Sequence, residues 1–141
     1  MPTHAEILKS MAENAIARME NNQRVLCSMP GTLDTSSIEA FYDSQIQPVQ
    51  NFLKALSFSN EIDVELCEIL DKADYVVTAA ALDNEVKEYS ANITNLQRFI
   101  LSTPVNPENP AEDKMKEAFD IQWAMVEAKS AFYELYNKVR F

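Results

Sequence analysis

Glycine is almost absent from this chain, and its absence limits the folds that the chain can adopt. One glycine, Gly31, occurs among 141 residues, whereas an average protein has about 7%. Glycine serves β-hairpins, bulges and tight turns, because it adopts backbone conformations that other residues avoid. We therefore predict an all-α fold with short connections, forming a single helical-bundle domain over residues 1–141.

The longest predicted helical segment runs from Glu61 to Leu101 and contains neither glycine nor proline. It carries two apolar series at helical spacing, which point to nearly opposite sides of a straight helix at about 100° per residue. Either one continuous helix packs on different neighbours along its length, or the helix breaks near Leu82–Asn84. We favour the continuous helix, which gives an antiparallel bundle of four long helices; the break would give five. The first series is Ile62, Leu66, Ile69, Ala73, Val76 and Ala80, and the second is Leu82, Val86, Tyr89, Ile93, Leu96 and Ile100.

The other helices are marked by local signals. Thr3 and Glu6 form a capping-box pattern that starts the first helix, and a Pro-Gly turn at residues 30–31 follows it. The second helix is expected to be one helix bent at Pro48, since its apolar residues keep the same phase on both sides; two short helices are the alternative. Three prolines between positions 104 and 110 predict a loop before the last helix.

The chain is acidic, with a formal net charge of −10. Nucleic acids and anionic membranes are therefore poor partners, because both are bound through lysine and arginine. The longest nearly apolar run, Tyr75–Leu82, is far shorter than the roughly 20 residues of a membrane span. The N-terminus does not resemble a signal peptide. We expect a cytoplasmic protein that binds no membrane.

The acids are concentrated at the start of the segment 61–101. We predict that they form a partner-binding face that meets a basic surface on another protein, although acidity that serves only solubility is the alternative. Some of these carboxylates also complement the positive end of a helix dipole. The predicted contact residues are Glu61, Glu65, Glu68, Asp71 and Asp74.

Trp123 is the other candidate for partner binding. On a helical wheel it falls on the polar side of the last helix, and tryptophan is enriched at binding hot spots. The alternative is that another segment covers it and that it belongs to the core.

Most catalytic chemistries lack the necessary residues. There is no glycine-rich phosphate loop, one histidine (His4), and no Cys/His set for zinc. One enzymatic alternative remains, a magnesium-dependent all-α nucleotide pyrophosphohydrolase. Residues 68–71 match the ExxD half of its metal-binding pattern, but the EExxE half is missing. We expect no enzyme activity, no cofactor and no metal site.

The leading hypothesis is therefore a non-enzymatic acidic protein-binding module, for example an inhibitor or immunity-type protein that masks a basic surface of its target. The second hypothesis is a structural protein that self-associates, for example as a homodimer, through an uncovered helical face.

Overall fold

The computed structural model describes residues 2–31, 34–59, 61–102 and 111–141, and the chain is helical over most of them. The five helices are α1 (His4–Cys27), α2 (Ser36–Ser59), α3 (Val64–Ile69), α4 (Lys72–Ser102) and α5 (Ala111–Arg140). The predicted all-α helical bundle is confirmed, with four long helices and the short α3 in addition. The predicted proline-rich loop falls on residues 103–110, which lie outside the described residues.

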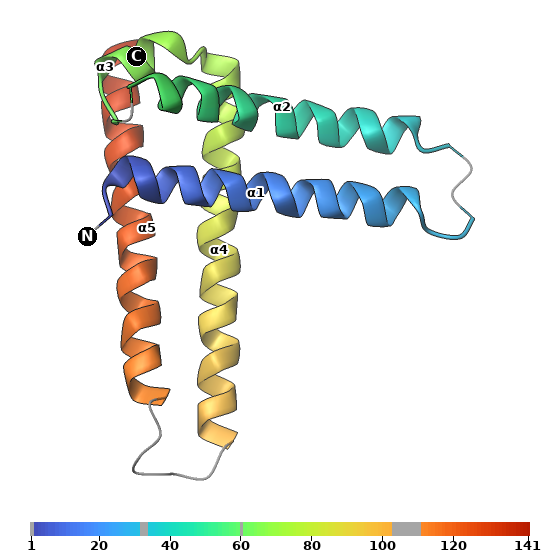
Figure 1. The fold of residues 1–141 in the computed structure, drawn as a ribbon, viewed down its shortest axis with the longest axis vertical. Helices are drawn as coiled ribbons and strands as arrows, with labels where there is room; N and C mark the ends of the chain where they lie inside the picture. The colour runs from blue at the N-terminus through green and yellow to red at the C-terminus, as the bar shows by residue number, and fades with distance from the viewer. Residues whose placement is uncertain (1, 32–33, 60, 103–110) are drawn as a thin grey trace.

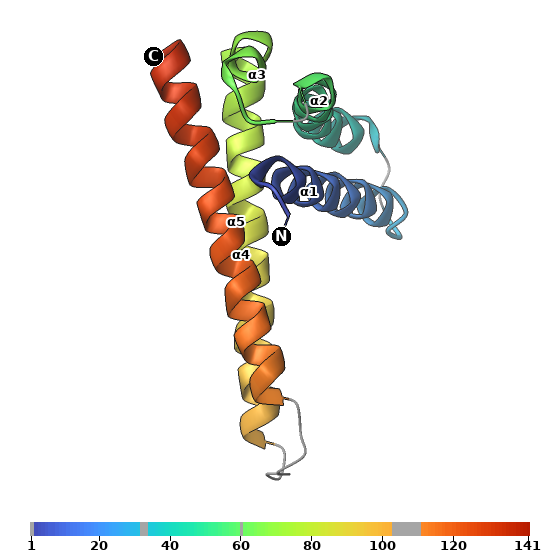
Figure 2. The ribbon, with the colours of Figure 1, turned by 60° about the vertical axis from the view of Figure 1, so that its left-hand side comes forward.

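The long helices form two antiparallel hairpins, and these hairpins cross. The α1/α2 hairpin lies across one half of the α4/α5 hairpin, and the outer ends of both extend beyond the crossing (Figure 1). The C-terminus lies at the same end of the molecule as α3, in both views (Figure 2). Among the helices of the described residues, none is long and apolar enough to cross a membrane.

The first two helices follow their sequence signals. Thr3 is the N-cap of α1, and its hydroxyl accepts a hydrogen bond from the Glu6 backbone N–H at 3.2 Å. Gly31 has a φ of 89° in the turn after α1, a conformation that favours glycine. The helix α2 continues through Pro48 as a single helix, the first of the two alternatives.

The segment 61–101 is broken, but not near Leu82–Asn84. The helix α4 is continuous through those residues, and the break lies at Leu70, whose backbone is extended (φ −81°, ψ 116°). Aspartates cap both helices at this junction. The Leu66 N–H donates to Asp63 Oδ1 at 3.0 Å, and the Asp74 N–H donates to Asp71 Oδ1 at 2.8 Å. Each side chain satisfies a backbone donor that a helix start leaves unpaired.

This position of the break changes which side chains are buried. Ile69, Ala73, Val76 and Ala80, four members of the first predicted apolar series, are exposed. The buried face of α4 instead passes through Tyr75, Thr78, Leu82 and Ile93, at helical spacing. The second predicted series therefore extends back to the start of α4, and the apolar face of α4 does not change sides.

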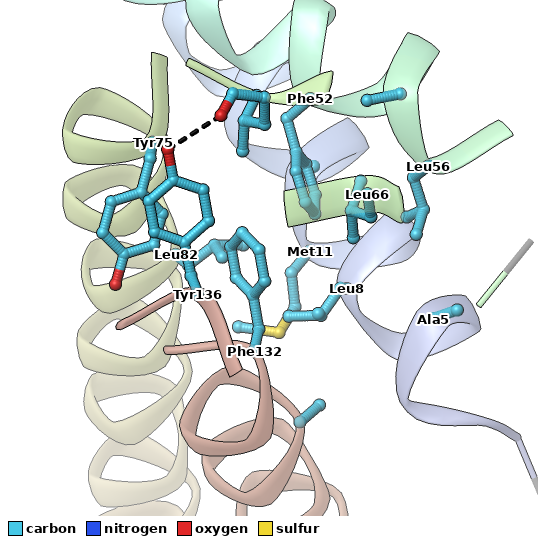
Figure 3. Packing of buried hydrophobic residues seen from close by; sticks show 14 of the residues in the cluster. Ala5, Leu8, Met11, Phe52, Leu56, Leu66, Tyr75, Leu82, Phe132 and Tyr136 are labelled. Atoms are coloured by element: carbon cyan, nitrogen blue, oxygen red, sulfur yellow. Dashed lines mark hydrogen bonds between the residues drawn. The ribbon is translucent and has the colours of Figure 1, made fainter. Parts of the chain in front are cut away.

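The core lies where the two hairpins cross and takes residues from all five helices. Leu8, Phe52, Leu66 and Phe132 are fully buried, and the Phe52 and Phe132 ring centroids are 5.1 Å apart. Figure 3 shows these side chains converging from separate helices. Among the residues whose burial the structure describes, the buried ones of α1 lie at or before Ala15 and those of α5 at or after Met125. The outer ends of the hairpins contribute little to this core.

Tyr136 connects the core to the junction between α3 and α4. Its ring stacks on Tyr75 with a centroid distance of 3.8 Å. Its hydroxyl donates a hydrogen bond of 2.8 Å to the Leu70 carbonyl oxygen, drawn as the dashed line in Figure 3. Tyr136 thus supplies a partner for a buried backbone group that the break at Leu70 would otherwise leave unpaired.

Candidate protein-binding surfaces

The five acidic residues predicted as a binding face lie close together in the chain, around α3 and the first turn of α4. Glu61, Glu65, Glu68 and Asp71 are exposed, and Asp74 is half-buried. Asp71 and Asp74 also have structural roles. Asp71 caps α4, and Asp74 accepts a hydrogen bond of 3.0 Å from Asn51 Nδ2 in α2.

Exposed aliphatic side chains accompany the remaining acids. On α3, Leu66 and Cys67 face the core, while Val64 and Ile69 remain 50% and 51% exposed. Val64 and Glu68 are four residues apart, as are Glu65 and Ile69, so these side chains form two neighbouring rows on one helix face. We call Val64, Glu65, Glu68 and Ile69 the acidic–apolar surface.

Trp123 is exposed, with 64% of its surface accessible. This is the first of the two predicted alternatives; the other was that a further segment covers it. Phe119 lies one turn earlier on the same side of α5 and is also exposed. The structure does not bring Trp123 together with the acidic residues. It lies thirteen residues before Tyr136, or about 20 Å along the helix axis from the α3–α4 junction that Tyr136 contacts. These are two separate surfaces.

A partly buried ion pair between α1 and α4 was not predicted. The Arg18 guanidinium pairs with the Glu85 carboxylate, and Glu85 is only 5% exposed. Burial raises the pKa of Glu85, while the Arg18 charge lowers it and Glu88 raises it further. The sequence contained one signal for this pair: Glu85 lies three residues after Leu82, on the buried face of α4.

A second ion pair joins α4 to α5. Lys129 Nζ lies 2.6 Å from Asp83 Oδ1, and the Tyr133 hydroxyl lies 2.9 Å from the same oxygen. Burial, followed by the hydrogen bond and charge of Asp83, raises the pKa of Tyr133. The Tyr133 hydroxyl is also 2.9 Å from the Ala79 carbonyl oxygen. These contacts hold the two helices of the hairpin together at a partly exposed position.

Within the part of the chain that the structure describes, no three His, Cys, Asp or Glu side chains are placed so that they could hold a metal ion. The pyrophosphohydrolase alternative, which would use Glu68 and Asp71, therefore has no ligand cluster among these residues.

No protein-family model, curated protein or solved structure matches this chain. The arguments about function below therefore rest on the side chains themselves: their exposure, their charge and their neighbours.

Proposed function

We propose that this chain is a non-enzymatic protein-binding module whose acidic–apolar surface docks on a basic patch of a protein partner, as an inhibitor or immunity-type protein would. The observation that carries the proposal is the exposure of Val64 and Ile69 beside Glu65 and Glu68. Single exposed apolar side chains are ordinary. Two of them on one short helix, next to carboxylates, are typical of a surface that is covered in a complex.

The two kinds of side chain have different roles in this proposal. The carboxylates steer a basic partner into place, which raises the association rate and makes it sensitive to salt. The aliphatic side chains lose their contact with water in the complex and slow dissociation. A net charge of −10 attracts a basic partner from a distance, because the whole molecule contributes to the field.

The test compares two pairs of charge reversals. Glu65→Lys with Glu68→Lys alters the acidic–apolar surface. Glu13→Lys with Glu20→Lys is the matched control, because it reverses two exposed glutamates on α1 and changes the net charge equally. The tagged wild type and both variants are used to capture proteins from the native host, and the captured proteins are identified by mass spectrometry.

We expect a basic protein that is captured by the wild type and by the control but not by the Glu65/Glu68 variant. The purified partner should then bind the wild type more weakly as salt concentration rises. Equal capture by all three proteins would contradict the proposed surface. A partner that is lost equally with the control would show that only the net charge matters.

Self-association is the second candidate, and the exposed pair Phe119 and Trp123 favours it. A two-fold dimer brings the same surface of each copy into contact, and aromatic side chains contribute strongly at such interfaces. Light scattering at tens of micromolar should then give the mass of a dimer for the wild type and of a monomer for Phe119→Ser with Trp123→Ser. A monomeric wild type would exclude this candidate.

A further inference from the structure

An open cleft lies in the angle where α1 crosses α4 and α5. Its volume is about 550 Å³, within the range of about 300–1,000 Å³ that is usual for small-molecule sites. One side is a continuous face of α1, because the lining residues Glu6, Ser10, Asn14 and Arg18 recur every four positions. The cleft is distinct from the acidic–apolar surface, which lies at the α3 end of the molecule (Figure 1).

The lining changes in character along α1. Near the start of α1, the apolar side chains Ile7 and Met11 line the cleft together with Ile121 and Met125 of α5, beside the polar Glu6 and Ser10. Further along α1, the lining is polar and meets α4. Figure 1 shows the corresponding course of the helix, which starts beside α5 and runs on toward α4. A ligand that fits this lining has an apolar body and a polar group at one end.

The polar part contains Arg18, Glu85, Asn14 and Asn92. Glu85 is the most deeply buried of these, and its carboxylate pairs with the partly exposed Arg18 guanidinium. A carboxylate has about four acceptor positions, so Arg18 leaves acceptor capacity unused. Burial outweighs Arg18 in setting the pKa of Glu85, which remains raised.

The ion pair is not explained by stability alone. Burying the Glu85 carboxylate carries a desolvation cost that its attraction to the partly exposed Arg18 often fails to exceed, so a well-packed apolar pair would join α1 to α4 at least as well. A buried charged group that lines a cleft and has a perturbed pKa is characteristic of a binding site. Glu6 is a second carboxylate of the same lining, so two carboxylates accompany the one guanidinium of Arg18 in this cleft.

We propose that this cleft binds a small organic cation, an amine or guanidinium carried on an apolar body. The cationic group donates hydrogen bonds to Glu85, beside Arg18 and Asn92. The apolar body lies along Ile7 and Met125. The strongly negative net charge of the protein favours a cation over an anion of the same shape.

Octylammonium is the probe, with octanoate and octanol as controls of the same chain length. Binding is measured by equilibrium dialysis and by chemical-shift changes in a ¹⁵N-labelled sample. We expect saturable binding of octylammonium, with octanol and octanoate weaker by about tenfold or more. Shifts should cluster around Asn14, Glu85 and Asn92. Absence of saturable binding, or octanoate binding as tightly as octylammonium, would overturn the proposal.

Three variants locate the site. Glu85→Gln removes the charge and should weaken octylammonium about tenfold while leaving octanol unchanged. Ser10→Trp places a large side chain in the cleft from an exposed position, keeps the ion pair, and should abolish binding of both. Glu20→Gln removes an exposed charge from the same helix outside this cleft and should change neither. If Glu85→Gln does not fold, as judged by circular dichroism, Ser10→Trp decides: retained octylammonium binding in that variant would refute the site.

Discussion

Replacing Tyr136 with phenylalanine should loosen the junction between α3 and α4 without disturbing the aromatic core. The change deletes only the hydroxyl that donates to the Leu70 carbonyl oxygen at 2.8 Å. The ring that stacks on Tyr75 is kept. Both Tyr136 and Leu70 are almost completely buried, so the carbonyl would lose its partner away from bulk water. A buried polar group left unpaired costs about 1–3 kcal/mol, and we expect Tyr136→Phe to lower the free energy of unfolding by about 2 kcal/mol.

Urea unfolding followed by circular dichroism gives this free energy by linear extrapolation. For a chain of this size, the same loss should lower Tm by about 4–8 °C. Asp71→Ala should cost about 1 kcal/mol on its own, because it removes the N-cap of α4. Since both changes act on one junction, the double variant should lose less than the sum of the two.

Tyr42→Phe is the control, because Tyr42 is a half-buried tyrosine of α2 and lies away from the junction. It should change the stability by no more than about 0.5 kcal/mol. If Tyr136→Phe were as mild as this control, the Leu70 carbonyl would have another partner, and the account of the junction given above would be wrong.

Three further predictions concern the core, the buried ion pair and the exposed tryptophan. Phe52→Ala should lower the free energy of unfolding by about 3–5 kcal/mol in urea titrations, because it leaves a cavity against Phe132. The folded-state pKa of Glu85 is raised, so the folded chain binds the Glu85 proton more tightly than the unfolded chain does. The free energy of unfolding of the wild type, compared with that of Glu85→Gln, should therefore fall as pH rises from the ordinary carboxyl pKa through the raised one. A flat difference across acidic pH would contradict this. Trp123→Ala should change the stability by no more than about 0.5 kcal/mol, and the fluorescence of the wild type, whose one tryptophan is exposed, should be readily quenched by acrylamide.

Local signals were sufficient to predict most of the helices. The start of α1 at Thr3 follows from a capping interaction within a few residues. The continuity of α2 through Pro48 was inferred from apolar residues that keep one helical phase on both sides of the proline. The all-α class was inferred from composition, through the scarcity of glycine.

The break at Leu70 was missed because an apolar series at helical spacing runs through it by coincidence. Leu66, Ile69, Ala73 and Val76 keep that spacing although the helix does not continue. Asp71 was interpreted as part of a charged face, whereas its carboxylate caps the next helix. An aspartate cap and a surface aspartate look alike in sequence, and tertiary packing decides between them.

The pairing of Arg18 with Glu85 joins residues 67 positions apart and depends on how one hairpin lies across the other. Hairpin formation follows from local patterns, but the direction in which two hairpins cross is set by side chains of both at once. For the same reason the cleft beside this pair could not be predicted. The one signal in the sequence was Glu85, a charged side chain on a buried helix face, which needs a positively charged or hydrogen-bonding partner.

The crossing of the two hairpins also sets how the molecule opens. Within the described residues, the buried side chains of α2 begin at Ile46 and those of α4 end at Ile93. Each outer hairpin end is therefore held together mainly by contacts between its own two helices. Segments with few buried contacts unfold locally at a low free energy, whereas amides around Phe52 and Phe132 exchange with solvent only when the whole domain opens. The chain therefore combines a stable core at the crossing with two outer hairpin ends that open more easily. A ligand bound in the cleft between α1 and the α4/α5 hairpin would connect one hairpin to the other, and would slow amide exchange well beyond the residues that it touches.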